Sequence, residues 1–544
     1  MSRKIALILL SVALYALALP PWSVWPLAWI ALVPFFLVLR DLGPAAGAWA
    51  GLLWGTAENW AFGYWVPGAL AFYYQQPLWF SLVFSFVLSI PAVGSFIAGF
   101  AACACARPFR RAGATGAILW AALWVVWELA RGHLLTGNPW LLLGYALLPR
   151  PILTQAADLG SVYVLSFVVV VVNVALAELI AVWPVLRVAL IGAPPPQEAV
   201  ETTARTAAST VALAIALVAA LCAYGNFRLA TPLPDAPRIP LRIVQGNNDL
   251  GTQWREEYYG RGLSDYLRMS TDGWAPPTSA RPMIVWPESA VTFFLAHEPS
   301  YRSAITRMLR PLDADLIVGA PHYEREGEGD VDQRYFNSAF YLAADGTLGE
   351  RYDKRHLLPF AEYFPLRTIE LLRRHFERVR FFSEGEGPAL LHTRIGPVAP
   401  VICFEGIFPH LVRGPMADGA VLLVNLSNDA WLGRRGGPEQ HLAMVTLRAV
   451  ENRTWVVRAT TTGVSAIIDP FGRVIARTAT FTPAVLDGEI VPLHVATFYK
   501  RFGDVFAYGC LLGLAFVATV DGLRVRTARR AADRTVRGRE AQIF

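Results

Sequence analysis

The chain has 544 residues, of which 54% are hydrophobic and only 17% are charged, and its mean hydropathy is +0.39. Soluble proteins usually carry about 25% charged residues, so these values exclude a single soluble globular domain. They also exclude a disordered chain, because 12% of the residues are aromatic and the formal net charge is only +6. At about 100–200 residues per domain, the length allows two or three structural units.

Charged residues are nearly absent from the N-terminal region. Between Ile5 and Ala106 the only Asp, Glu, Lys or Arg residues are Arg40, Asp41 and Glu58. A membrane-spanning helix needs about 20 mainly apolar residues, because lipid offers no hydrogen-bond partner to an exposed backbone amide. We predict eight spanning helices, at 5–20, 24–40, 46–65, 79–103, 114–131, 161–183, 209–226 and 505–522. The first stretch also fits a cleaved signal peptide, although another apolar stretch follows it at once.

Lysine and arginine in the short loops predict which side of the membrane each loop faces. One set of alternate loops, together with the C-terminal tail, is rich in them: Arg3, Lys4, Arg40, Arg107, Arg110, Arg111, Arg187, Arg205, Arg524, Arg526, Arg529, Arg530, Arg534, Arg537 and Arg539. The other set holds Arg131 and Arg150, and Lys500 and Arg501 lie on that side against the rule. We therefore predict cytoplasmic termini and an extracytoplasmic insert before the last span. The same bias accounts for the basic excess without a nucleic-acid partner.

The segment from Arg238 to about His494 has the composition of a soluble domain, with short β-rich runs between polar turns. Seven runs fit buried strands, at 241–244, 283–286, 316–318, 340–342, 398–402, 421–424 and 455–457. Helical stretches lie near 300–309 and 440–451. We predict four parts: a membrane domain of seven spans over 1–230, a mixed α/β domain over 238–496, a last span over 505–522, and a basic cytoplasmic tail over 523–544.

The chain has five cysteines, and Cys403 is the only one in the α/β insert, so a disulfide within that domain is impossible. The other four lie in or beside the predicted spans, where small apolar packing is the usual role. A lone thiol outside the cytoplasm is either buried and inert or a nucleophile. Because Cys403 follows the apolar run 398–402, a rigid strand can present it on a loop.

A thiol attacks as the thiolate, so a nucleophilic cysteine needs a base and a positive group for the developing oxyanion. The histidines of the insert show no spacing that singles one out, and no paired Cys/His spacing suggests a metal. Glu288 follows a predicted buried strand, Lys354 comes after a strand pair, and Glu362 lies in the string 359–363; taken singly, each is more simply a solvated loop charge. A carboxylate and a thiol differ by about four pKa units, so a working pair requires a desolvated glutamate beside a cation. Glu288 and Lys354 can supply both.

The order Glu288, Lys354, Cys403 resembles the catalytic triad of the nitrilase, or carbon–nitrogen hydrolase, superfamily. Further strings resemble one branch of it, the bacterial apolipoprotein N-acyltransferases, at 244–247, 353–363, 425–431 and 461–464, and in the membrane part at 136–140 and 144–145. With the eight predicted spans, the resemblance covers nearly the whole chain.

The resemblance implies an αββα sandwich and a two-step acyl transfer. Cys403 would take an acyl chain from a phospholipid as a thioester and pass it to the α-amino group of an S-diacylglyceryl-cysteine lipoprotein. Glu288 would be the general base, and Lys354 would stabilise the tetrahedral oxyanion. The resemblance also implies a monomer in the bacterial inner membrane, a periplasmic catalytic domain, and no metal or other cofactor.

Five further residues match supporting positions of that branch. Glu362 and Glu405 match glutamates that position the lysine and the amine, and Asn428 lies in the string 425–431. Trp254 lies where the family has a tryptophan on a mobile substrate-contacting loop. Phe404 departs from the pattern, because a tyrosine is common there and its hydroxyl is missing.

Two other functions remain open on the sequence. A membrane-tethered amidase or nitrilase would share the triad but deliver the acyl group to water, and it should turn over soluble amides without lipid. A transporter or structural membrane protein would be indifferent to the loss of Cys403. The lack of apparent internal repeats counts against the transporter.

Overall fold

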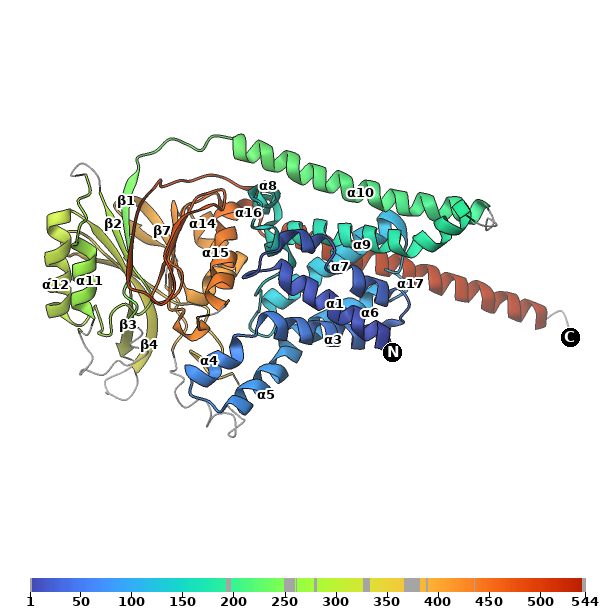
Figure 1. Ribbon diagram of the computed structural model, residues 1–544, viewed down its shortest axis with the longest axis horizontal. Coiled ribbons are helices and arrows are strands. Elements are labelled where there is room, and N and C mark those ends of the chain that lie inside the picture. Colours follow the sequence, from blue (N-terminus) through green and yellow to red (C-terminus); the bar gives the residue numbers. More distant parts are fainter. Residues whose placement is uncertain are drawn as a thin grey trace.

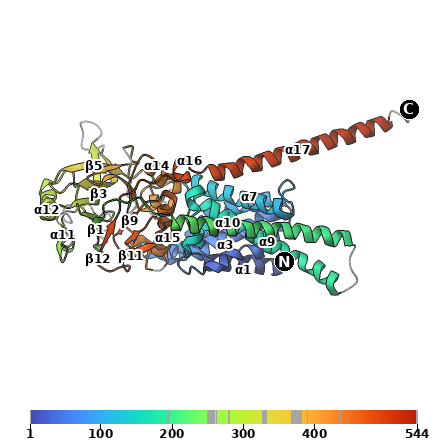
Figure 2. The ribbon, with the colours of Figure 1, turned by 90° about the horizontal axis from the view of Figure 1, so that it is seen from above.

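The computed structural model describes residues 2–191, 197–248, 260, 262–277, 281–325, 333–365, 382–387, 390–434 and 436–540. Within them the chain forms a bundle of apolar helices and an α/β part, set end to end (Figure 1). The sheets lie at the left of Figure 1 and the bundle at the right, and both chain ends lie at the bundle end away from the sheets. Seen from above in Figure 2, α17 extends furthest from the sheets.

The bundle is built mainly from the first 230 residues. Its first half contains α1 (Ser2–Ala18), η1 (Trp25–Trp29), α2 (Val33–Leu39), α3 (Pro44–Phe62), α4 (Val66–Phe72), α5 (Leu78–Ser89), η2 (Ile90–Gly94) and α6 (Ser95–Ala104). Its second half contains α7 (Gly113–His133), η3 (Leu143–Leu147), α8 (Pro151–Thr154), α9 (Ala157–Ile191) and α10 (Gln197–Ala230), and α17 (Val505–Glu540) joins it from the end of the chain.

Five helical segments of the described chain are long and apolar enough to cross a membrane: Leu78–Ala104, Gly113–His133, Ala157–Trp183, Ala204–Ala230 and Val505–Ala531. They coincide with five of the predicted spans. The other three predicted spans correspond to α1, to the shorter apolar stretch Trp25–Leu39 and to α3. The total of eight therefore stays a prediction.

Two of these segments carry local irregularities with identifiable causes. The segment Leu78–Ala104 contains a π-turn at η2, where Pro91 lacks an N–H and its ring displaces the carbonyl one turn earlier. Helix α9 is broken at Gly160 and Ser161, where the φ of Ser161 is 59°. The hydroxyl of Ser161 donates to Glu451 of the α/β part at 2.6 Å, so this break lies at the contact between the two parts.

Helix α17 runs on to Glu540, so most of the predicted basic tail continues the last helix.

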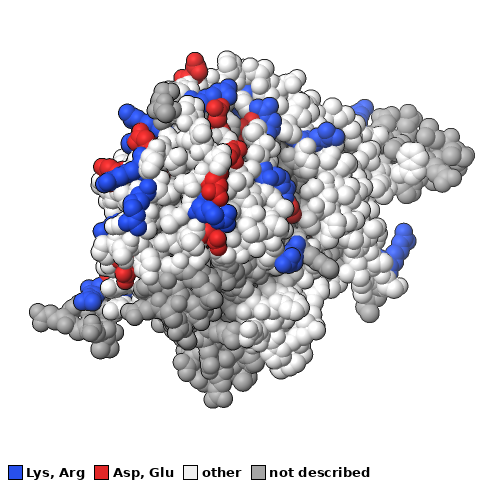
Figure 3. All heavy atoms as spheres, turned by 60° about the vertical axis from the view of Figure 1, so that its left-hand side comes forward, with Lys and Arg blue, Asp and Glu red and all other residues white. Residues whose placement is uncertain are grey.

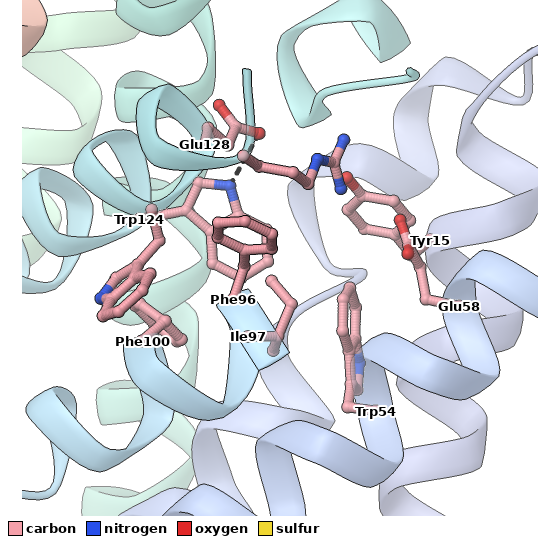
Figure 4. A pocket seen from close by; sticks show the side chains of 10 residues that line it. Tyr15, Trp54, Glu58, Phe96, Ile97, Phe100, Trp124 and Glu128 are labelled. Carbon is pink, nitrogen blue, oxygen red and sulfur yellow. Dashed lines mark hydrogen bonds between the residues drawn. The ribbon is translucent and has the colours of Figure 1, made fainter. Parts of the chain in front are cut away.

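A small cavity with a mainly apolar lining lies inside the bundle (Figure 4). Aromatic side chains surround it, and Glu58, Glu128 and Arg131 line it. Its volume of about 10 Å³ suits a single water molecule. Glu128 accepts a hydrogen bond from the indole of Trp124 at 2.9 Å. In the described part of the chain, neither carboxyl oxygen of Glu58 has a hydrogen-bond partner.

The α/β part contains two six-stranded sheets, ordered β12-β1-β2-β3-β4-β5 and β11-β10-β9-β8-β7-β6. The strands are β1 (Ile239–Gln245), β2 (Met283–Trp286), β3 (Asp315–Arg325), β4 (Gln333–Leu342), β5 (Leu348–Asp353), β6 (Leu391–Thr393), β7 (Gly396–Ile402), β8 (Leu422–Ser427), β9 (Val456–Thr460), β10 (Ala466–Ile468), β11 (Val474–Arg477) and β12 (Ala484–Ile490). The pairs β1–β2, β2–β3, β7–β8 and β8–β9 are parallel, and the other pairs are antiparallel. All seven runs predicted as strands overlap strands: five lie wholly within one, and the runs 421–424 and 455–457 begin one residue before β8 and β9.

The alternation of side chains along the strands explains the layers, because successive residues point to opposite faces of a sheet. Ile284 of β2 packs with the helices α11 (Leu263–Thr271) and α12 (Pro299–Leu309), whereas its neighbour Val285 belongs to the core between the sheets. In the second sheet, Leu423 packs with α14 (Pro409–Ala417) and α15 (Gly437–Asn452), whereas Val424 faces inward. These layers form the expected αββα sandwich. On the face drawn in Figure 3, its basic and acidic side chains are interspersed.

Candidate active site

The three residues of the predicted triad each follow a strand of the sandwich. Glu288 comes after β2, Lys354 after β5 and Cys403 after β7, so both sheets contribute. Their exposed fractions are 7%, 1% and 3%, respectively. The charges of Glu288 and Lys354 both act on the Cys403 thiol. The structure therefore brings the three predicted residues into one buried site.

The backbone is strained at three places around this site. Cys403 has φ +53°, Ser289 beside Glu288 has φ +50°, and Phe360 in the loop before Glu362 has φ +63°. A residue with a side chain adopts such angles at a cost of about 1–3 kcal/mol, which the surrounding structure must offset. At Cys403 this bend ends strand β7 and starts the short helix η6 (Cys403–Ile407).

A continuous chain of polar contacts joins Glu288 to Lys354. Asn337 on β4 donates through Nδ2 to Oε1 of Glu288 at 2.7 Å and to Oε1 of Glu362 at 2.9 Å. The other oxygen of Glu362, Oε2, forms an ion pair with Lys354 Nζ at 2.7 Å and accepts from the backbone N–H of Leu358 at 2.8 Å. Glu362 therefore contacts both Lys354 and Asn337 directly.

Glu288 has the properties of a general base. Its Oε2 accepts a hydrogen bond from the backbone N–H of Asn428 at 2.6 Å, and its own carbonyl accepts from the hydroxyl of Thr461 at 3.1 Å. Burial raises the pKa of Glu288 to about 7, against the lowering effect of Lys354. A base is most effective when its pKa lies near the working pH.

The thiol and the lysine differ in their resting charge. Burial raises the pKa of Cys403 well above its usual range, and the charge of Glu288 adds to this effect, although Lys354 and a hydrogen bond with Ser427 oppose it. Burial alone would lower the pKa of Lys354, but Glu362, Cys403 and Glu288 outweigh it and raise the pKa above its usual range. The resting site therefore holds a neutral thiol beside an ammonium group, and the thiol proton must leave as the sulfur attacks.

Glu405 supports the backbone rather than the lysine side chain. Its Oε1 accepts from the hydroxyl of Tyr352 at 2.8 Å and from the backbone N–H groups of Arg355 and His356 at 2.8 and 3.0 Å. Its Oε2 accepts from the backbone N–H of Ile402 at 2.7 Å. Glu405 thus ties the turn after Lys354 to the strand that ends at Cys403.

The remaining predicted residues have different places. The Phe404 ring is 7% exposed and packs on His356 and Phe408, with ring centroids 5.9 and 4.9 Å away. Asn428 contributes its backbone N–H to Glu288, and its side chain accepts from Ala430 at 3.1 Å. Trp254 lies outside the described residues. Among the residues that are described, no group of three His, Cys, Asp or Glu side chains is arranged to hold a metal ion.

Sequence reasoning missed two residues of the site. Asn337 bridges two carboxylates from the interior of β4, where nothing in the sequence distinguishes it from any other polar strand residue. His441 contacts the carbonyl of Cys403 through Nε2 at 3.2 Å. Its position at the start of the predicted helix 440–451 was the available signal, but the spacing of the histidines does not select it.

Comparison with known proteins identifies the family. The profile described as the apolipoprotein N-acyltransferase N-terminal domain matches residues 11–175, and the profile described as carbon-nitrogen hydrolase matches residues 187–498. A Geobacter metallireducens protein named apolipoprotein N-acyltransferase is 35% identical over 533 residues, which cover 95% of this chain and 95% of that protein. This chain belongs to the apolipoprotein N-acyltransferase family. The resemblance inferred from the sequence strings is thereby confirmed.

Other members of the apolipoprotein N-acyltransferase family match over similar lengths. A protein of that name from Azotobacter vinelandii is 32% identical and covers 96% of this chain and 95% of its own length. One from Pseudomonas putida is 31% identical, with 92% and 94% covered. Among solved structures, the yeast nitrilase-superfamily protein Nit3 matches 48% of this chain and 93% of its own, with 17% identity and a TM-score of 0.36.

Proposed function

We propose that the chain moves a fatty acyl chain from a phospholipid to the N-terminal amine of an S-diacylglyceryl-cysteine apolipoprotein, through a thioester on Cys403. The observation that carries this proposal is the hydrogen-bonded chain from Glu288 through Asn337 and Glu362 to Lys354, which surrounds a single buried thiol. Relatives named apolipoprotein N-acyltransferase match the bundle as well as the sandwich, which supports a substrate drawn from the membrane.

In the first step, Cys403 Sγ attacks the ester carbonyl of the phospholipid while its proton passes to Glu288. The developing oxyanion is stabilised by the ammonium group of Lys354, which Glu362 holds in place. The tetrahedral intermediate collapses as the carbon–oxygen bond breaks, and Glu288 returns the proton to the leaving lysophospholipid oxygen. The products are an acyl thioester on Cys403 and a lysophospholipid.

In the second step, the neutral α-amine of the acceptor attacks the thioester carbonyl. Glu288 takes the amine proton, Lys354 again stabilises the oxyanion, and the carbon–sulfur bond breaks. The sulfur then recovers the proton from Glu288. A base with a pKa of about 7 can both accept and return the proton at neutral pH.

We further propose that the protein is a monomer in the bacterial inner membrane, with cytoplasmic termini and a periplasmic sandwich, and that it needs no cofactor. The distribution of lysine and arginine supports this orientation, as does the position of both chain ends at the far end of the bundle (Figure 1). The proposed units are a membrane domain over 1–230, a catalytic domain over 238–496, a last span over 505–522 and a basic segment over 523–544.

The test is direct observation of the acyl-enzyme. Incubation with phospholipid radiolabelled in its acyl chain should label the native protein, and hydroxylamine should release the label. Cys403→Ala should remain unlabelled while it still inserts and folds. Absence of label on the native protein, or retained label on Cys403→Ala, would overturn the proposal.

The alternative of a membrane-tethered amidase or nitrilase makes a different prediction. Such an enzyme should hydrolyse soluble amides in detergent without phospholipid and should not need an amine acceptor. We expect no such turnover, and we expect a diacylated lipopeptide with a free amine to discharge the labelled enzyme. Discharge by water at the same rate would favour the hydrolase.

A further inference from the structure

Helix α15 lies between the active site and the bundle, and one face of it bonds to the bundle along its length. Gln440, Met444, Arg448 and Glu451 are spaced so that they share one helix face. Met444 Sδ accepts from the backbone N–H of Leu141 at 3.3 Å, Arg448 donates to the Tyr145 hydroxyl at 2.8 Å, and Glu451 accepts from Ser161 at 2.6 Å. The helix is therefore anchored to the bundle at several points.

The side-chain amide of Gln440 makes four hydrogen bonds to the bundle. Its Oε1 accepts from the indole N–H groups of Trp65 and Trp140, both at 2.9 Å. Its Nε2 donates to the backbone carbonyls of Pro20 and Phe62 at 3.2 and 3.0 Å. An amide oxygen has two acceptor positions and its NH₂ group has two donor hydrogens. The four bonds therefore satisfy the whole hydrogen-bonding capacity of this fully buried side chain. It fixes three separate segments of the bundle to one point of α15.

The next residue, His441, faces the active site. Its Nε2 lies 3.2 Å from the carbonyl oxygen of Cys403, and it must donate the hydrogen because a carbonyl only accepts. Its Nδ1 lies 3.0 Å from Asp429 Oδ1 and 3.1 Å from Arg458 Nη2, and Arg458 also pairs with Asp429 Oδ2 at 2.7 Å. His441, Asp429 and Arg458 are at most 1% exposed. The imidazole ring of His441 therefore holds the strained backbone of Cys403 in place.

We propose that Gln440 and His441 are positioning residues that set the Cys403 thiol at a fixed place against the membrane bundle. Gln440 fixes α15 to the bundle, and His441 fixes the Cys403 backbone to α15. The inference rests on the proposed function, because it concerns how the thiol meets a donor held in the bilayer. The loss of Gln440 should therefore slow attack on a bilayer phospholipid far more than attack on a small soluble ester, which can approach the thiol freely.

The test compares two reactions of the same full-length variants. The first is formation of the acyl-enzyme from radiolabelled phosphatidylethanolamine in vesicles that also contain phosphatidylglycerol. The second is the burst of p-nitrophenolate from the soluble ester p-nitrophenyl butyrate: Cys403 Sγ binds the acyl carbon, the thiol proton passes to Glu288, and p-nitrophenolate leaves as the butyryl thioester forms. Gln440→Leu should lower the first rate at least tenfold and the second less than twofold. His441→Leu should lower both at least tenfold.

Two further variants show whether the effect belongs to Gln440 itself. Gln440→Glu keeps an oxygen that can accept from Trp65 and Trp140 but cannot donate to the two carbonyls, so its rate with vesicles should fall between those of the native protein and Gln440→Leu. Ser161→Ala cuts the anchor at Glu451, about 16 Å further along α15. It should leave both rates within twofold of the native values.

The outcomes separate the possible failures. If Gln440→Leu lowers both reactions equally, the residue only supports the fold; if it lowers neither, it has no positioning role. An effect of Ser161→Ala as large as that of Gln440→Leu would assign the role to the interface as a whole. Label or a p-nitrophenolate burst that persists in Cys403→Ala would instead overturn the proposed function and, with it, this inference.

Discussion

Two buried sets of ionisable side chains stand in contrast: the cluster around Cys403 and the cavity inside the helix bundle. At the active site, Glu288, Glu362 and Glu405 have a hydrogen-bond partner on every carboxylate oxygen. In the cavity of Figure 4, Glu58 is equally buried, yet in the described part of the chain neither of its carboxyl oxygens has one.

The difference shows how burial alone fails to identify a catalytic site. In a fully hydrogen-bonded network, each side chain is held in one position. A buried carboxyl group without hydrogen-bond partners is desolvated, which costs free energy, and no hydrogen bond fixes its orientation. Around Cys403, the hydrogen bonds hold Glu288 and Lys354 in fixed positions beside one thiol, as the proposed mechanism requires. In the cavity, Glu128 accepts a hydrogen bond from Trp124, whereas both carboxyl oxygens of Glu58 lack a hydrogen-bond partner among the described residues. Substitutions at matched positions in the two sets should therefore have very different effects.

The largest effect is expected for Lys354→Met. It removes the oxyanion's cation and leaves the carboxylates of Glu362 and Glu288 without their positive neighbour, so acyl-enzyme formation should fall about 10³-fold. A single-turnover assay with radiolabelled phospholipid measures this rate. Lys500 offers a matched control, since its Nζ is also buried but has no hydrogen-bond partner among the described residues. Lys500→Met should stay within threefold, and a loss of less than tenfold in Lys354→Met would reject the oxyanion role.

A smaller loss, of about 10–100-fold, is expected for Asn337→Leu. This change removes the donor shared by Glu288 and Glu362, so both carboxylates keep their charge but lose their common orientation. The lost hydrogen bond also lowers the pKa of Glu288 in the native protein, so the pH midpoint of acylation should move above 7 in the variant. Asn59→Leu, which cuts a bond to Ser89 within the bundle, should change neither quantity. An unshifted midpoint in Asn337→Leu would separate Asn337 from the base.

The native protein should show a tenfold change in acylation rate between pH 6 and pH 8, by the arithmetic of one group that titrates near 7. Glu288 accepts the thiol proton only when it is ionised, and burial raises its pKa to about 7. The rate should therefore be low at acid pH and rise to a plateau above neutrality. Glu288→Gln should be slow and flat across this range. A profile that falls with rising pH would contradict the assignment of Glu288 as the base.

The smallest effect is expected for Glu58→Gln. The amide has nearly the same shape as the carboxyl group, and no existing hydrogen bond within the described chain is lost. Acylation should stay within twofold, and the melting temperature in detergent should be unchanged or higher. A tenfold loss of activity would show that the bundle cavity takes part in the reaction, as the cluster around Cys403 is proposed to do.

The sequence predicted seven of the strands because these are short apolar runs between turns, whereas the αββα arrangement was implied by the family resemblance. Glu288, Lys354 and Cys403 were predicted as a site because their order matches a known triad, and the structure brings the three side chains into one buried site. Asn337 and His441 were not found, since their roles depend on partners that the fold brings close. His441 contacts the carbonyl of Cys403, 38 positions earlier in the chain. The residues adjacent to either position in the sequence do not predict that contact.

For the helix bundle too, the sequence predicted only part of the structure. Composition locates its apolar stretches but not the break of α9 at Gly160 and Ser161. The π-turn at Ile90–Gly94 has a local signal in Pro91, which the span prediction did not use. The charge of Glu58 inside a predicted span signals something unusual without showing that its oxygens lack partners. The place of Trp254 stays a prediction.

The four bonds of Gln440 also constrain when the protein can be completed. Its partner Pro20 lies 420 positions earlier in the chain, and a ribosome adding about 5–20 residues per second needs about 20–80 s to cover that distance. Throughout this interval the first helices are already made, while the amide that joins their loops has not yet been synthesised. The links between these loops therefore form only after β1 to β8 have been made, and a nascent chain that stalls before residue 440 would leave the loops without them.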